Sequence, residues 1–80
     1  MLAGKRFRLT VTTLGIENLV FHRQAVQIPE DEVITVLSDP RPDERGMIDV
    51  LWNNRTLVMF AEDIEARGQE IVGGSNDGAW

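Results

Sequence analysis

Apolar and polar residues alternate with a period of two in several short stretches of the chain, a pattern that predicts half-buried β-strands. The first stretch places Phe7, Leu9 and Val11 on one face, with Arg8 and Thr10 between them. Other runs rich in β-branched and aromatic residues follow, separated by turn-forming segments. Together these runs predict five strands, at residues 7–13, 33–37, 47–52, 56–60 and 69–72.

The connections between the first three predicted strands are long. Residues 14–32 form an excursion, which contains two apolar pieces. These pieces, 19–21 and 25–28, can make a small hairpin that ends at Pro29, because proline lacks the backbone donor that a sheet requires. Residues 38–46 contain two prolines and a closing glycine, and are therefore predicted to be a loop without regular structure.

A short helical turn is predicted between the last two strands, within residues 61–68. Acidic residues come first in this segment, Arg67 comes last and Gly68 follows. This order suits the helix dipole and a glycine at the C-terminal cap. We therefore expect one short 3₁₀ or α turn before the last strand.

Asn53 and Asn54 join the two most apolar runs of the chain. Asparagine tolerates positive φ, so this pair suits a type I′ turn that closes a two-residue hairpin. Such a turn fixes the register, with Trp52 opposite Arg55 and the pairing continuing to the far ends of both strands. Arg55 can then lie over the Trp52 ring in a cation–π contact.

This register divides the hairpin into two faces. One face is apolar except at its tip and is expected in the core; it holds Ile48, Val50, Trp52, Arg55, Leu57 and Met59. The other face is also apolar apart from Asp49 and Thr56, although a solvent face should be polar. Its apolar members form a candidate self-association face: Met47, Leu51, Val58 and Phe60.

The sequence leaves open what covers this second face. The excursion at residues 14–28, a second layer of sheet or another protein chain would each cover it. Alternatively, it forms a groove for a ligand or peptide, because contiguous exposed apolar patches commonly mark interaction sites.

Chain length and composition limit how the protein is stabilised. Eighty residues allow one domain, which we place at residues 1–72, followed by a flexible polar tail at 73–80. Small domains commonly depend on disulfides, metal ions or oligomerisation. The chain has no cysteine and one histidine, so we expect no metal ion and no cofactor. An efficient core or a second subunit remains as the source of stability.

Charge is distributed unevenly along the chain. Residues 1–29 carry four cations against one acid, a net charge of +3, whereas residues 30–80 carry four cations against twelve acids, a net charge of −8. We expect the two segments to attract each other within one fold. We do not expect nucleic acid as a partner, because the cations are few and the acidic remainder repels phosphate.

Neither a membrane segment nor a secretion signal is evident. No apolar run approaches the ~20 residues that cross a bilayer. The basic residues near the N-terminus are not followed by the apolar stretch of a signal peptide. The expected location is therefore the cytoplasm, without a membrane partner.

Candidate catalytic groups lack the partners that chemistry requires. His22 has no recognisable nucleophile or orienting acid near it in the sequence. The acidic cluster of Glu62, Asp63 and Glu65 suits a solvated turn, because these residues lack the ligand spacing of a calcium loop. We therefore expect no enzymatic activity.

The order of the connections resembles that of SH3-like barrels over about residues 7–72. In this resemblance residues 14–32 take the place of the RT loop, 38–46 of the n-Src loop, Asn53-Asn54 of the distal turn, and 61–66 of the 3₁₀ turn. The fold class it implies is all-β: a five-stranded SH3-like barrel with one short helical turn before the last strand. The chain has no tyrosine, so the aromatic groove with which SH3 domains grip polyproline is missing.

The whole chain, and especially residues 8–15 and 47–64, also looks like small uncharacterised bacterial proteins, a likeness that implies no function. The leading hypothesis for function is a small protein-interaction or scaffold module. Its candidate partner contacts are Trp52, Arg55, Arg41 and Phe60. The alternatives are a self-assembling homo-oligomeric barrel, which buries the self-association face, and a small enzyme whose site forms only between subunits.

Overall fold

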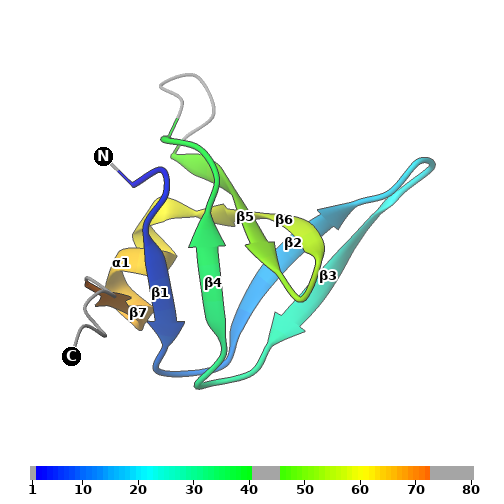
Figure 1. The fold of residues 1–80 in the computed structure, drawn as a ribbon. Helices are drawn as coiled ribbons and strands as arrows, with labels where there is room; N and C mark the ends of the chain where they lie inside the picture. The colour runs from blue at the N-terminus through cyan, green and yellow to red at the C-terminus, as the bar shows by residue number, and fades with distance from the viewer. Residues whose placement is uncertain (1, 41–45, 73–80) are drawn as a thin grey trace.

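The computed structural model describes residues 2–40 and 46–72, and the strands in this range form one antiparallel sheet. The elements are β1 (Arg6–Leu9), β2 (Thr13–Asn18), β3 (Arg23–Ile28), β4 (Val33–Val36), β5 (Met47–Trp52), β6 (Arg55–Phe60), α1 (Ala61–Arg67) and β7 (Gly68–Ile71). Their order across the sheet is β3-β2-β6-β5-β4-β1-β7 (Figure 1). The all-β class is thereby confirmed, and so is the short helix before the last strand.

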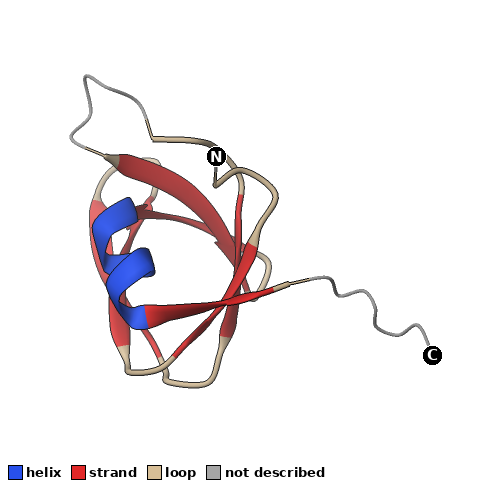
Figure 2. Cartoon of the chain, turned by 90° about the vertical axis from the view of Figure 1, so that its left-hand side faces the viewer, coloured by secondary structure: helices blue, strands red, loops and turns tan. Residues whose placement is uncertain are grey.

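The prediction of a five-stranded barrel is wrong in strand number and in closure. The excursion after β1 contributes two strands of its own, β2 and β3, so the described part of the chain has seven strands. The sheet curls around the core but remains open, because it ends at β3 on one side and at β7 on the other (Figure 2).

The single strand predicted at residues 7–13 is divided because the chain changes its pairing partners. β1 pairs with β4 and β7, whereas β2 pairs with β3 and β6. At the corner between them, the backbone N–H and the hydroxyl of Thr10 both donate to the carbonyl of Arg67, at 2.7 and 2.9 Å. The Thr13 hydroxyl donates to the carbonyl of Val11 at 3.0 Å. These bonds satisfy the backbone where no strand pairing does.

The β5–β6 hairpin has the predicted register. Trp52 pairs with Arg55, and the pairing continues to Met47 opposite Phe60. The two turn residues adopt the left-handed backbone conformation, as a type I′ turn requires. Their φ angles are 53° for Asn53 and 62° for Asn54.

The core lies on the concave side of the curled sheet. Every strand from β1 to β6 except β2 contributes buried apolar side chains, and α1 adds two more. The twelve residues are Phe7, Leu9, Val26, Ile28, Ile34, Val36, Ile48, Val50, Leu57, Met59, Ala61 and Ile64. The expected core face of the β5–β6 hairpin is therefore confirmed, and Trp52 packs against the edge of this core.

The β2–β3 hairpin projects from the body of the molecule as an arm (Figure 1). Its pairing is continuous from Thr13 opposite Ile28 to Asn18 opposite Arg23. The base of the arm joins the sheet through Ile16, which pairs with Val58 of β6. The arm makes the molecule elongated, with principal extents of 47, 26 and 22 Å.

Candidate docking groove

The arm extends the apolar second face of the β5–β6 hairpin instead of covering it. Paired residues of neighbouring strands share one face of a sheet. Ile16 of β2 is paired with Val58 on one side and with Ala25 of β3 on the other. This face, which we call the outer face, therefore continues from β5 through β6 to β2 and β3, where Ile16 and Ala25 extend its apolar surface.

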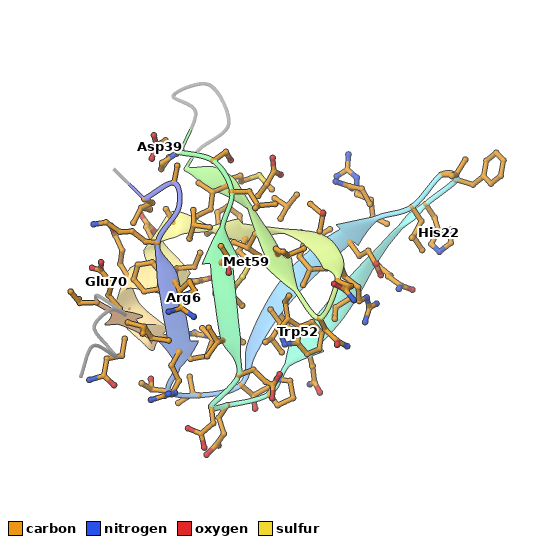
Figure 3. All side chains as sticks on the ribbon, in the orientation of Figure 1. Arg6, His22, Asp39, Trp52, Met59 and Glu70 are labelled. Atoms are coloured by element: carbon orange, nitrogen blue, oxygen red, sulfur yellow. The ribbon has the colours of Figure 1, made fainter. Side chains whose placement is uncertain are left out.

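A groove of about 350 Å³ lies on this outer face where the base of the arm meets β6. Its apolar side chains come from β2, β3, β5 and β6: Leu14, Ile16, Ala25, Met47, Val58 and Phe60. Met59 and Gly15 also line it, and Met59 is buried and points inward in Figure 3, so the groove reaches the edge of the core. Among the described residues that line the groove, only Asp63 is charged.

The groove is open to solvent. Leu14 is 56% exposed and Phe60 is 43% exposed, and both are large apolar side chains. No part of the described chain covers them. Exposed apolar surface of this kind, concentrated in one hollow, is typical of a protein interaction site.

Gly15 brings the arm close to the body at the groove. A Cβ atom at this position would lie 3.2 Å from Leu57 Cδ1 and 3.4 Å from Met59 Cγ, which is tighter than most carbon contacts. Glycine thus lets β2 lie directly over buried side chains of β6. The same residue interrupts the alternating pattern of the sequence, which is why the arm's contribution to the groove was not predicted.

Trp52 and Arg55 belong to a different surface, at the tip of the β5–β6 hairpin. The Arg55 guanidinium lies 6.0 Å from the centre of the Trp52 ring, and its Nε and Nη2 donate to the Glu17 carboxylate at 3.1 and 2.6 Å. Gln24 donates to the same carboxylate at 2.8 Å, and the Trp52 indole donates to Glu32 at 2.9 Å. This cluster ties the arm and the β3–β4 turn to the hairpin.

The hydrogen bonds of this cluster shift the ionisation of both charged partners. Donation by Arg55, and then by Gln24, lowers the pKa of Glu17 below its ordinary value of 4.5. The hydrogen bond to Glu17 likewise raises the pKa of Arg55. The cluster's polar groups are already paired, so its geometry fits a structural tie better than a catalytic centre.

The lowered pKa of Glu17 predicts a loss of stability in acid. A carboxylate with a depressed folded-state pKa stabilises the fold above its unfolded-state pKa, and this contribution disappears as the pH falls through the folded-state value. We expect the stability difference between the wild-type protein and Glu17→Gln to be constant above about pH 5 and to shrink below pH 4.5. Urea unfolding across this range measures it.

The partner residue provides the control for this measurement. Arg55→Gln removes the donor that chiefly lowers the pKa of Glu17. Like Glu17→Gln, this variant should therefore lack the contribution to the free energy of unfolding that the wild-type protein loses in acid. The bonds from the Ala3 and Leu2 amides also lower the pKa of Asp39, but this effect is common to all variants and cancels in the comparison. A difference between wild type and Glu17→Gln that does not change between pH 7 and pH 3 would contradict the prediction.

The structure does not bring the four candidate partner contacts together. Trp52 and Arg55 lie on the core side of the sheet at one end of the β5–β6 hairpin, whereas Phe60 lies on the outer face at the other end. Arg41 and the tail at 73–80 lie outside the described residues. Of the candidate self-association face, Met47, Val58 and Phe60 line the groove, and Leu51 lies farther along β5. The sequence missed the arm residues Leu14, Ile16 and Ala25.

The ion pairs among the described residues follow the charge asymmetry only in part. Lys5 of the basic segment pairs with Glu70 of the acidic segment at 3.8 Å, as the asymmetry predicted. The Arg55–Glu17 pair runs the other way, because its acid comes from the basic segment. Both pairs are partly exposed, so the asymmetry does not by itself explain how the segments pack.

No cluster of three or more His, Asp or Glu side chains able to hold a metal ion occurs within residues 2–40 and 46–72. In the same ranges, no helix has the length and apolar character needed to cross a membrane. Comparisons with models of protein families, with curated proteins and with solved structures give no significant match to the chain.

Proposed function

We propose that the protein is a small protein-interaction module, whose groove on the outer face accepts a large apolar side chain from a partner protein. The observation that carries this proposal is the open apolar groove between the arm and β6. Large apolar anchors that fill such hollows supply most of the binding energy in protein interfaces.

The lining of the groove favours a protein segment over a polar metabolite. Sites for small molecules commonly combine apolar walls with several convergent polar groups that fix the ligand's orientation. Here Asp63 is the one charged side chain that lines the groove, within the described part of the chain. An apolar side chain would fill the hollow, and the Asp63 carboxylate would favour a nearby cation on the same partner segment.

The fold itself is proposed to be related to SH3-like barrels. The order of its connections supports this relation: a hairpin after the first strand, a tight turn between β5 and β6, and a short helix before the last strand. The proposed groove is unlike a polyproline site, because its described lining has no tyrosine and Phe60 is its one aromatic residue. This relation therefore concerns architecture and does not identify the partner.

Selection from a library of random peptides tests the proposal. We expect wild-type protein to enrich peptides that carry a large apolar side chain next to a basic one. Leu14→Glu should weaken these peptides by about tenfold or more, because it places a charge in the apolar hollow. Fluorescence anisotropy of the labelled peptides measures the affinity.

Gln27→Glu provides the matched control. Gln27 pairs with Leu14 across the arm, so this variant adds the same charge to the same face but not to the groove lining. Both positions are exposed, and neither variant is expected to unfold the protein. Failure to enrich any peptide, or equal weakening by both variants, would overturn the proposed function.

A further inference from the structure

The tip of the arm carries two apolar side chains that nothing in the described chain contacts closely. Val20 is 89% exposed and Phe21 is 94% exposed, and they occupy the centre of a tight turn. The backbone N–H of Leu19 donates to the carbonyl of His22 at 2.7 Å and closes this turn. Tight turns normally contain glycine, asparagine, aspartate, proline or serine, so two large apolar residues are unexpected here. Residues that conflict with local structural preference are expected at functional or strained sites.

The arm holds this tip away from its own groove. Its pairing is continuous from the base to Asn18 opposite Arg23, and this pairing keeps both strands of the arm extended. At about 3.3 Å for each strand residue, the tip lies roughly 13 Å beyond Ile16, which lines the groove. Figure 1 shows the tip at the far end of the molecule. While this pairing is intact, the tip therefore does not reach the groove of the same copy.

Charge around the tip is complementary to charge around the groove. The cation at the tip is Arg23, two residues after Phe21, and the intervening His22 is seen at the tip in Figure 3. The groove has the Asp63 carboxylate in its lining. Both the apolar group and the adjacent cation that the groove favours are therefore present on this chain itself.

We propose that the arm tip of one copy docks in the groove of a second copy, with Phe21 entering the apolar hollow and Arg23 facing Asp63. This inference rests on the proposed function, since it names the partner for the same groove. Tip and groove are different surfaces of the chain, so one contact leaves a free groove on one copy and a free tip on the other. Two copies can satisfy both by exchanging arms, or more copies can assemble head to tail.

Two variants separate the two sides of this contact. Phe21→Ser removes the tip but keeps the groove, and Leu14→Glu blocks the groove but keeps the tip. Each alone is expected to be monomeric under conditions in which the wild-type protein self-associates. Mixed together, they should form a one-to-one heterodimer, because the intact tip of Leu14→Glu can enter the intact groove of Phe21→Ser. Analytical ultracentrifugation with one variant fluorescently labelled measures this.

Val72→Ser is the matched control for Phe21→Ser. Val72 is another highly exposed apolar residue, but it lies after β7, away from both tip and groove. This variant should self-associate like the wild-type protein. Phe21 is on an exposed turn, so circular dichroism should show the same fold in all variants.

The other outcomes would overturn the inference in distinguishable ways. If Leu14→Glu is monomeric while Phe21→Ser still self-associates, the groove binds another surface of the second copy. If both variants self-associate, the contact lies elsewhere, such as at the free edge of β3. A wild-type protein that stays monomeric at about 1 mM also overturns the inference, because the dissociation constant of the contact would then be weaker than millimolar. In each case the peptide selection tests the proposed function separately.

Discussion

Replacing Ile64 with alanine is expected to lower the free energy of unfolding by about 2–5 kcal/mol, the usual cost of deleting a large buried aliphatic group. Ile64 is fully buried, and with Ala61 it is one of two side chains through which α1 enters the core. A domain of this length has a total stability of about 4–12 kcal/mol, so the loss would be a large fraction of it.

α1 depends on Ile64 because its length and its N-terminal cap do little to stabilise the helix. Seven residues are too few for a stable isolated helix. Phe60 occupies the N-terminal cap position, and no side chain caps the first backbone amides. Burial of Ile64 must therefore hold the helix against the sheet.

Chemical denaturation measures this effect directly. Glu65→Ala is the matched control, since Glu65 is adjacent in the helix but exposed. We expect the Ile64→Ala midpoint to fall far below that of the control. Equal midpoints for the two variants would show that the helix does not depend on its buried side chain.

The β5–β6 hairpin was predictable from sequence because its information is local. Asn53 and Asn54 favour one turn type, and this turn fixes every pair between the two strands. Alternation with a period of two then divides the residues between the core and the outer face. Nothing beyond the hairpin's own fourteen-residue segment is needed for this result.

The corner between β1 and β2 was not predictable by the same means. Residues 7–13 alternate as one strand, but the chain leaves the β4 and β7 partnership after Leu9 and joins β3 and β6 from Thr13. Alternation reports which face a residue occupies and contains no information on its pairing partner. The number of strands and the openness of the sheet depend on such partners.

One side of the groove was predictable from the sequence, and the other side was not. Its β5 and β6 side, with Met47, Val58 and Phe60, follows from the local register of the hairpin. Its other side requires Ile16 to pair with Val58, a contact between residues 42 positions apart. Within β2, Gly15 is the one sequence signal that this strand lies close to another element. Its meaning depends on knowing that Leu57 lies beneath it.

The arm links these findings to the proposed assembly. An apolar outer face that stops at β6 would be a simple exposed patch, whereas the base of the arm turns it into a hollow with walls. The same hairpin carries Val20 and Phe21 at its other end. One supersecondary element thus supplies part of the proposed receptor surface and all of the proposed ligand.

Replacing Gly68 with alanine is expected to lower the free energy of unfolding by about 3 kcal/mol, the upper end of the usual cost of overpacking. The sequence predicted this glycine as a helix cap, a role that often requires positive φ. In the structure its φ is −112° and its ψ is 151°, an extended conformation that alanine adopts freely. Glycine is required for space: an added Cβ would lie 2.6 Å from the Ile64 carbonyl oxygen and 3.2 Å from Phe7 Cβ.

Relaxation cannot easily relieve this clash. The Gly68 N–H donates to the same Ile64 carbonyl, so moving β7 away would break the bond that ends the helix. If space were not limiting, the substitution would stabilise the protein by about 0.4–1 kcal/mol by reducing the freedom of the unfolded chain. Urea unfolding measures the change in the free energy of unfolding. A loss of stability shows that space for a Cβ is limiting, and a gain shows that the freedom of the unfolded chain dominates. Gln69→Ala, at the next and exposed position of β7, should leave stability nearly unchanged, and a gain of stability in Gly68→Ala would refute the steric explanation.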